Sequence, residues 1–146
     1  MRAAVRFCLI VSTLFYGCGP TRAADAASVS AADHQAIEQV ITSQQDAFRR
    51  DASDSAFSFA SPKIQSMFGN APHFMAMVRQ GYSPVYRSRY FAFEQLATND
   101  QRIVQRVTII GPDGGMALAL YTMEHEQDGT WRIDGCELTQ PDGLNT

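Results

Sequence analysis

The hydrophobic pattern of this chain changes once, near Pro84, and this change restricts its possible folds more than any other feature. Before Pro84, apolar residues recur at three- and four-residue spacing, which is typical of amphipathic helices. After Pro84, segments rich in Tyr, Phe, Val and Ile are separated by turn sequences, which is typical of strands. Helices followed by consecutive antiparallel strands predict an α+β domain whose helices pack on one face of the sheet.

The helical half divides at its Pro and Gly residues. Ser30, with the acidic residue Asp33 three positions later, is a helix start signal, and a long amphipathic helix is expected over residues 31–51. Residues 54–81 predict three short helices, because Pro at a first helical position and Gly after the last one punctuate the segment.

Four strands are expected, over residues 85–96, 102–110, 116–126 and 130–138. A loop at 127–129 with Gly in its left-handed position places Met123 opposite Ile133 in the last hairpin. One face then carries Tyr121, Met123, Trp131 and Ile133, and the other carries Leu118, Leu120, Thr122, Asp134, Cys136 and Leu138. Because both faces carry apolar residues, we expect the helices to cover one and a second subunit to cover the other, in a homodimer.

The N-terminus has the pattern of a cleavable secretion signal. Arg2 and Arg6 precede a short apolar run, and the small residues up to Ala26 fit a cleavage site. The run is too short to span a bilayer, so we expect an exported protein, periplasmic or secreted, without a transmembrane segment in its mature form. The alternative is a lipoprotein signal, in which Cys18 would be acylated and would tether the domain to a membrane.

With the signal at residues 1–26, the chain divides into a linker at 27–32, a single domain at 33–140 and a flexible tail at 141–146. The whole chain has 146 residues and a formal net charge of −3. Removal of the signal takes away three arginines and one aspartate, which leaves the mature domain near −5. An acidic domain without a run of Lys and Arg is not expected to bind nucleic acid.

One cysteine remains after cleavage of the signal, Cys136, so the mature domain has no internal disulfide. We expect this cysteine to be buried, and the alternative is an exposed reactive thiol. The histidines are too scattered for metal-ligand spacing, and the glycine-rich segment at 111–115 joins two strands rather than a strand and a helix. The sequence therefore predicts neither a metal site nor a cofactor.

Several short sequence segments resemble those of a bacterial family known only as domain of unknown function 4864. They are QDAF at 45–48, FSFASPKIQ at 57–65, MVRQGY at 77–82, PVYR at 84–87 and WRIDG at 131–135. The resemblance covers about residues 33–138, and the blocks at 59–62 and 81–86 are its most specific parts. The family has no established activity.

The order of a long helix, short helices and a curved four-stranded sheet also resembles the nuclear transport factor-like, or cystatin-like, cone superfamily. That superfamily includes ketosteroid isomerase, scytalone dehydratase and polyketide cyclases. The resemblance implies a pocket between the sheet and the helices. The enzymes of the superfamily use an Asp as the base in that pocket, often with Tyr or His. No local motif in this chain matches those catalytic residues, so an enzyme assignment would be analogy alone.

Two groups of polar residues are candidates for chemistry. Asp134, on the last strand, would suit proton transfer if it faced a pocket, and otherwise it is a surface carboxylate near Arg132 or at a sheet edge. Tyr82, Tyr86, Arg87 and Arg89 gather where the helices meet the sheet and could hold an anionic or carbonyl ligand. The alternative is that the tyrosines pack with their hydroxyls at the rim while the arginines are solvated.

Two further side chains lie in the helical half. Gln44, on the apolar face of the first helix, either points into a cavity as a neutral hydrogen-bonding group or lies at the margin of the apolar stripe. Ser61 is explained better as a helix cap than as a nucleophile.

Three functions follow from these observations. The preferred hypothesis is a noncatalytic exported module that binds a small amphipathic ligand or a protein partner, with Tyr86, Gln44 or Asp134 orienting the ligand. The second is an isomerase, dehydratase or cyclase that uses Asp134 as its base. The third is a structural or assembly protein of the cell envelope that acts through its sheet surface.

Overall fold

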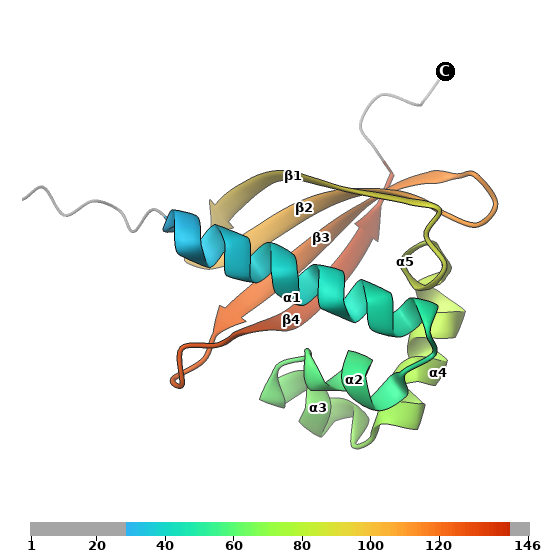
Figure 1. Ribbon diagram of the computed structural model, residues 1–146, viewed down its shortest axis with the longest axis horizontal. Helices are drawn as coiled ribbons and strands as arrows, with labels where there is room; N and C mark the ends of the chain where they lie inside the picture. Colours follow the sequence, from blue (N-terminus) through green and yellow to red (C-terminus); the bar gives the residue numbers. More distant parts are fainter. Residues whose placement is uncertain (1–28, 141–146) are drawn as a thin grey trace, which may run out of the picture.

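The computed structural model describes residues 29–140, in which helices cover one face of a curved antiparallel sheet (Figure 1). In these residues the helices come first: α1 (Ala31–Arg49), α2 (Ser53–Ser58), α3 (Pro62–Phe68), α4 (Ala71–Gly81) and α5 (Ser83–Tyr86). The strands follow in the sheet order β1 (Tyr90–Asn99), β2 (Arg102–Ile110), β3 (Met116–His125) and β4 (Trp131–Thr139). The predicted α+β class is confirmed. The predicted signal sequence and tail lie outside the described residues.

Polar caps set the limits of the helices where the sequence predicted them. The Ser30 hydroxyl accepts a hydrogen bond from the Asp33 amide at 3.1 Å and starts α1. The Ser61 hydroxyl accepts from the Ile64 amide at 3.3 Å and starts α3, with Pro62 in its first turn. Helix α1 ends at Arg49 because Asp51 adopts the left-handed conformation, with φ of 54°.

The first strand begins later than the sequence predicts. Residues 83–86 form the short helix α5, so the expectation of a strand from Val85 is wrong. Pro84 favours this outcome, because its fixed φ suits the first turn of a helix. Val85 then packs into the core with 3% exposure, and β1 starts at Tyr90.

The last hairpin has the predicted register only as far as Ile133. Met123 pairs with Ile133, as expected for a turn in which Gly129 has φ of 85°. Beyond this pair a β-bulge inserts one residue into β4, so that Thr122 pairs with Gly135. Cys136 and Leu138 therefore lie opposite Tyr121 and Ala119 on the helix-covered face, and the prediction that they face the other side is wrong.

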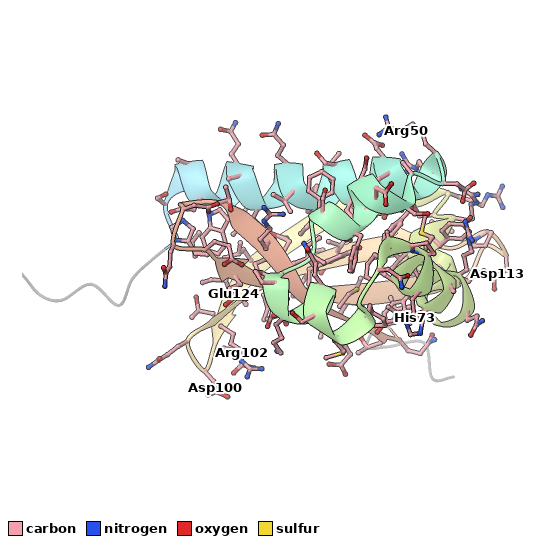
Figure 2. All side chains as sticks on the ribbon, turned by 90° about the horizontal axis from the view of Figure 1, so that it is seen from below. Arg50, His73, Asp100, Arg102, Asp113 and Glu124 are labelled. Carbon is pink, nitrogen blue, oxygen red and sulfur yellow. The ribbon has the colours of Figure 1, made fainter. Side chains whose placement is uncertain are left out.

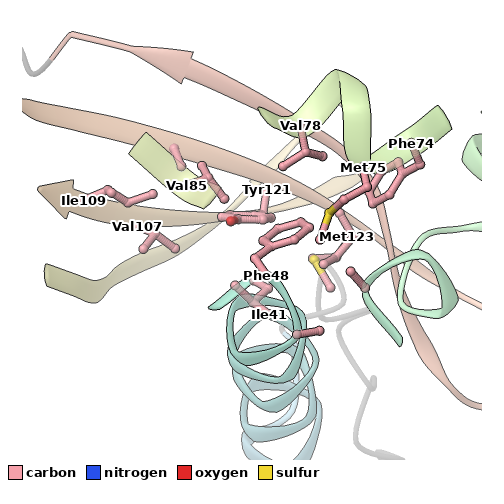
Figure 3. Packing of buried hydrophobic residues seen from close by; sticks show 14 of the residues in the cluster. Ile41, Phe48, Phe74, Met75, Val78, Val85, Val107, Ile109, Tyr121 and Met123 are labelled. Atoms are coloured by element: carbon pink, nitrogen blue, oxygen red, sulfur yellow. The ribbon is translucent and has the colours of Figure 1, made fainter. Parts of the chain in front are cut away.

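The core lies between α1, α4 and the covered face of the sheet. Ile37 and Ile41 of α1 are fully buried, as are Val107 and Ile109 of β2. Figure 3 shows Tyr121 of β3 beside Phe48, with Met123 close by. The apolar stripe of α1 thus packs directly on the covered face of the sheet.

The opposite face of the sheet has no helical cover in the described part of the chain (Figure 1). Its apolar residues include Val104 and Leu120, which are half-buried between charged neighbours. Figure 2 shows Asp100 and Arg102 at the tip of the β1–β2 hairpin, away from α1. Within residues 29–140 no helix is long and apolar enough to cross a lipid bilayer.

The outer edge of β4 is occupied by the segment that joins α2 and α3. The Ser61 amide donates to the Ile133 carbonyl at 2.8 Å, and the Ile133 amide donates to the Phe59 carbonyl at 2.9 Å. Ala60 thereby forms a parallel bridge with Ile133. This bridge fixes the short helices against the strand that forms one wall of the pocket.

Candidate functional site

A half-open pocket of about 250 Å³ lies between the helices and the covered face of the sheet. The α1 residues Gln44 and Phe48 form one side, and Tyr121, Ile133 and Cys136 form the floor. The short helices supply the remaining wall, with Ala60, Ile64, Met67, Phe68, Phe74, Met77, Val78, Tyr82 and Val85. The space is therefore built by residues from both halves of the sequence.

The walls of the pocket are mainly apolar. The ring centroid of Phe74 lies 5.6 Å from that of Phe68 and 6.4 Å from that of Phe48, so three aromatic side chains of the wall pack together. Met67 of α3 is 65% exposed although it lines the pocket, so α3 borders the opening. Among the described lining residues there is no Asp, Glu, Lys, Arg or His. Such a surface favours the uncharged part of a ligand.

Two of the predicted polar residues lie in this pocket. Gln44 is 4% exposed, and its amide nitrogen donates to the Ala56 carbonyl at 3.0 Å. The Tyr82 hydroxyl donates to the Cys136 carbonyl at 2.9 Å. Burial raises the pKa of Tyr82, so the phenol keeps its proton at neutral pH. Both are neutral hydrogen-bonding groups held in fixed positions.

Cys136 is a third polar group in the pocket wall, and the sequence placed it on the wrong face. Burial is the main cause that raises the pKa of its thiol to about 12, while the neighbouring Tyr121 opposes the rise. The pKa of Tyr121 is also raised, again mainly by burial. A thiol that keeps its proton is a poor nucleophile, although the residue as a whole is half-buried rather than fully buried as predicted.

Asp134 lies at the bulge in β4 and does not line the apolar pocket. Its carboxylate accepts a hydrogen bond from the Ser61 hydroxyl at 2.7 Å and pairs with the Lys63 ammonium at 3.2 Å. It borders instead a broad depression on the uncovered face, which also includes Arg102, Arg106 and Glu137. Charges of both signs line this depression, in contrast to the apolar pocket. Asp134 therefore lies apart from Gln44 and Tyr82.

Tyr86 and Arg87 belong to a separate exposed group, the Asp51 cluster, which consists of Asp51, Arg79, Tyr86 and Arg87. The Tyr86 hydroxyl donates to the Asp51 carboxylate, and Arg87 pairs with the same carboxylate at 2.8 Å. These two contacts, the Tyr86 contact first, lower the pKa of Asp51 to about 2. The Arg87 guanidinium lies 4.1 Å from the centre of the Tyr86 ring.

The Asp51 cluster also closes the end of α1. The Arg87 guanidinium donates to the carbonyls of Phe48 and Arg49 at 3.0 and 3.1 Å, where the helix leaves these acceptors free. Arg79 adds a second ion pair with Asp51 at 3.3 Å. The polar atoms of Tyr86 and Arg87 are thus engaged with other protein groups outside the pocket. Arg89 is exposed, and its amide donates to the Ile110 carbonyl.

The sequence identified Gln44 and Tyr82 as candidates but missed most of the pocket. The short helices carry Ile64, Phe68 and Met77 at helical spacing, which indicated an apolar face without showing what it meets. Cys136 was missed because the bulge that turns it inward was not recognised, although Gly135 inside the strand is a signal that often marks a bulge. In residues 29–140, no group of three His, Cys, Asp or Glu side chains could hold a metal ion.

The protein is a small α+β domain in which a layer of helices and an open antiparallel sheet enclose an apolar pocket. The chain belongs to the family described as Domain of unknown function (DUF4864), whose model matches residues 30–146. No curated protein and no solved structure matches the chain. The family description names no activity, so a function has to be argued from the pocket.

Proposed function

We propose that this protein is a noncatalytic binding module that holds the apolar part of a small amphipathic ligand between α1, the short helices and the sheet. The observation that carries the proposal is the pocket of about 250 Å³ whose described lining has no charged Asp, Glu, Lys, Arg or His side chain. Ligand sites are concave and mostly apolar, with a few placed polar groups. Gln44 and Tyr82 are such groups here.

The polar groups in the pocket favour binding over catalysis. General acid–base catalysis at neutral pH needs a group with a pKa near 7 within reach of the substrate. The Cys136 thiol has a pKa of about 12, and the pKa of Tyr82 is raised above its ordinary value. The Asp134 carboxylate, the base required by an isomerase or dehydratase mechanism, is bound to Ser61 and Lys63 outside the pocket lining.

Binding is tested by thermal unfolding against a panel of lipids and small metabolites. We expect at least one amphipathic compound to raise the melting temperature in a concentration-dependent way, because a ligand that binds only the folded state stabilises it. The variant Met77→Trp should abolish this response by filling the pocket. Met116→Trp is the matched control, because Met116 is an exposed residue outside the pocket lining.

The proposal fails if every compound leaves the melting temperature unchanged in the wild-type protein. It fails equally if Met77→Trp and Met116→Trp respond to the same compounds as the wild type does. Far-UV circular dichroism of both variants establishes that they are folded before they are compared.

We also propose that the protein acts outside the cytoplasm, on the basis of the N-terminal sequence pattern. Mass spectrometry of the protein from a fractionated bacterial host should give a mature chain that starts at Ala27. A lipid-modified chain that starts at Cys18 would show instead that the module is tethered to a membrane. An uncleaved chain in the cytoplasm would contradict both forms of export.

A further inference from the structure

The pocket offers its ligand a particular balance of hydrogen-bonding groups. Gln44 uses one amide proton for the Ala56 carbonyl, and this contact fixes which end of the amide is nitrogen. The amide oxygen then points the other way, and among the described residues no hydrogen bond to it is formed. This oxygen is not fully enclosed by the protein, so a ligand that displaces solvent from it has to supply a donor in its place.

Tyr82 adds a second acceptor. Its single hydroxyl proton is used for the Cys136 carbonyl at 2.9 Å, which leaves the lone pairs of the phenolic oxygen. The raised pKa of Tyr82 keeps this arrangement in place at neutral pH. Gln44 and Tyr82 thus both present oxygen atoms as acceptors, and the remaining amide proton of Gln44 is one neutral donor.

An anionic group would fit this pocket poorly. A carboxylate brings only acceptors, and it needs a cation or several N–H donors to replace its water. The described lining side chains include no Lys, Arg or His. A hydroxyl group, in contrast, donates one hydrogen bond and accepts another while it remains uncharged.

We infer that the pocket takes a neutral alcohol or phenol, an apolar molecule whose hydroxyl donates to the oxygen of Gln44 or Tyr82, and that it discriminates against the carboxylate of the same skeleton. This inference rests on the proposed binding function and specifies its ligand class. The apolar body of the ligand would lie against Phe48, Phe74 and Val78, which line the same pocket as Gln44 and Tyr82.

The test uses three probes that share an eight-carbon chain: 1-octanol, methyl octyl ether and octanoate. Their affinities for the purified protein are measured by titration calorimetry or by ligand-observed NMR. We expect 1-octanol to bind about 10-fold more tightly than the ether, which can only accept, because one net hydrogen bond separates them. Octanoate should bind more weakly than 1-octanol by at least the same factor.

Two variants locate the preference. Gln44→Met keeps the length of the side chain and removes its acceptor, and Tyr82→Phe removes the hydroxyl. The variant that removes the acceptor used by the hydroxyl should weaken 1-octanol binding by about 5- to 10-fold and leave the ether unchanged, which a purely structural role would not do, and an unchanged 1-octanol affinity in both variants would overturn the inference. Tyr90→Phe, a hydroxyl removed outside the pocket lining, is the matched control. If Gln44→Met does not fold, the ranking of the three probes on the wild-type protein still tests the claim.

The outcomes separate this inference from the proposed function. Equal binding of all three probes, abolished by Met77→Trp, overturns the hydroxyl preference and leaves the binding module intact. Tighter binding of octanoate overturns the preference in the same way. A failure of all three probes to bind overturns the assignment to alcohols, and the wider panel then decides whether the module binds any ligand.

Discussion

Ile109 and Ile110 are neighbours on β2 with identical side chains, but they lie on opposite faces of the sheet. Ile109 is fully buried under the helices, whereas Ile110 is half-buried on the face that no helix covers in the described chain. The inner face also holds the pocket, and the outer face carries Arg106, Glu94 and the open depression. For this pair, the helix layer rather than the residue type decides which side chain is fully enclosed.

The largest expected difference is in the free energy of unfolding when each of the two isoleucines is truncated to alanine. Ile109→Ala removes buried methyl groups and leaves a cavity, so the free energy of unfolding should fall by about 2–5 kcal/mol. Ile110→Ala should cost about 1 kcal/mol or less, since its side chain is already partly hydrated. Urea denaturation measures both. Similar losses for the two variants would break the distinction between the faces.

Cysteine reactivity tests the bulge that assigns Cys136 to the inner face. With a pKa of about 12, its thiolate fraction at pH 8 is roughly 10³-fold below that of an ordinary cysteine. In a Thr122→Cys variant, the new thiol on the outer face should therefore react with iodoacetamide at least about 100-fold faster than Cys136.

Peptide mass spectrometry follows both alkylation reactions in the same molecule. The same protein unfolded in guanidinium is the control, because both cysteines should then react at similar rates. Fast labelling of Cys136 in the folded protein would place it on the outer face, without the bulge.

The outer face is where we expect a second copy of the chain. It carries basic residues such as Arg102 and Arg106 beside acidic ones such as Glu124 and Glu137, so two copies can meet with opposite charges paired. Light scattering should give a dimer at micromolar concentrations. Leu120→Lys should shift it to a monomer by placing a charge in the centre of this face.

The control for the dimer prediction is Gln39→Lys, which adds the same charge to the exposed surface of α1. It should leave the dimer unchanged. A wild-type protein that is monomeric throughout the concentration range would show that solvent alone covers the outer face.

The smallest effect concerns pH and the Asp51 cluster, which anchors α5 to the end of α1 beside the inner face. Because folding lowers the pKa of Asp51 from 3.8 to about 2, its stabilising contribution is present above pH 4 and is lost as the pH falls towards 2. The melting temperature of Asp51→Asn should therefore decline less steeply than that of the wild type across this interval. If the melting temperatures of Asp51→Asn and the wild type decline in parallel, the Asp51 cluster does not stabilise the fold.

The sequence predicted the parts of the fold that depend on local signals. The caps at Ser30 and Ser61 and the pairing of Met123 with Ile133 each follow from a few neighbouring residues. The bulge after Ile133 depends also on the partner strand, so Gly135 signals a bulge in this strand without fixing the register that follows it. That single insertion reversed the predicted side of Cys136.

The clearest sequence signal for the candidate site was a polar side chain that interrupts an apolar stripe. Gln44 was recognisable in this way, and the structure places it in the pocket. Tyr82 and Tyr86 were indistinguishable in the sequence, but one lines the pocket and the other binds Asp51. The difference arises from the turn between α4 and α5, which directs residues four positions apart to different neighbours.

The bridge between Ala60 and Ile133 has a consequence for how this protein can associate. An unpaired strand edge is a template on which further strands, and eventually fibrils, can grow. Here the backbone of residues 59–61 already occupies the β4 margin, and a bulge after Phe93 interrupts the regular ladder of β1. Lateral extension of the sheet is thereby discouraged at both margins, which opposes runaway polymerisation.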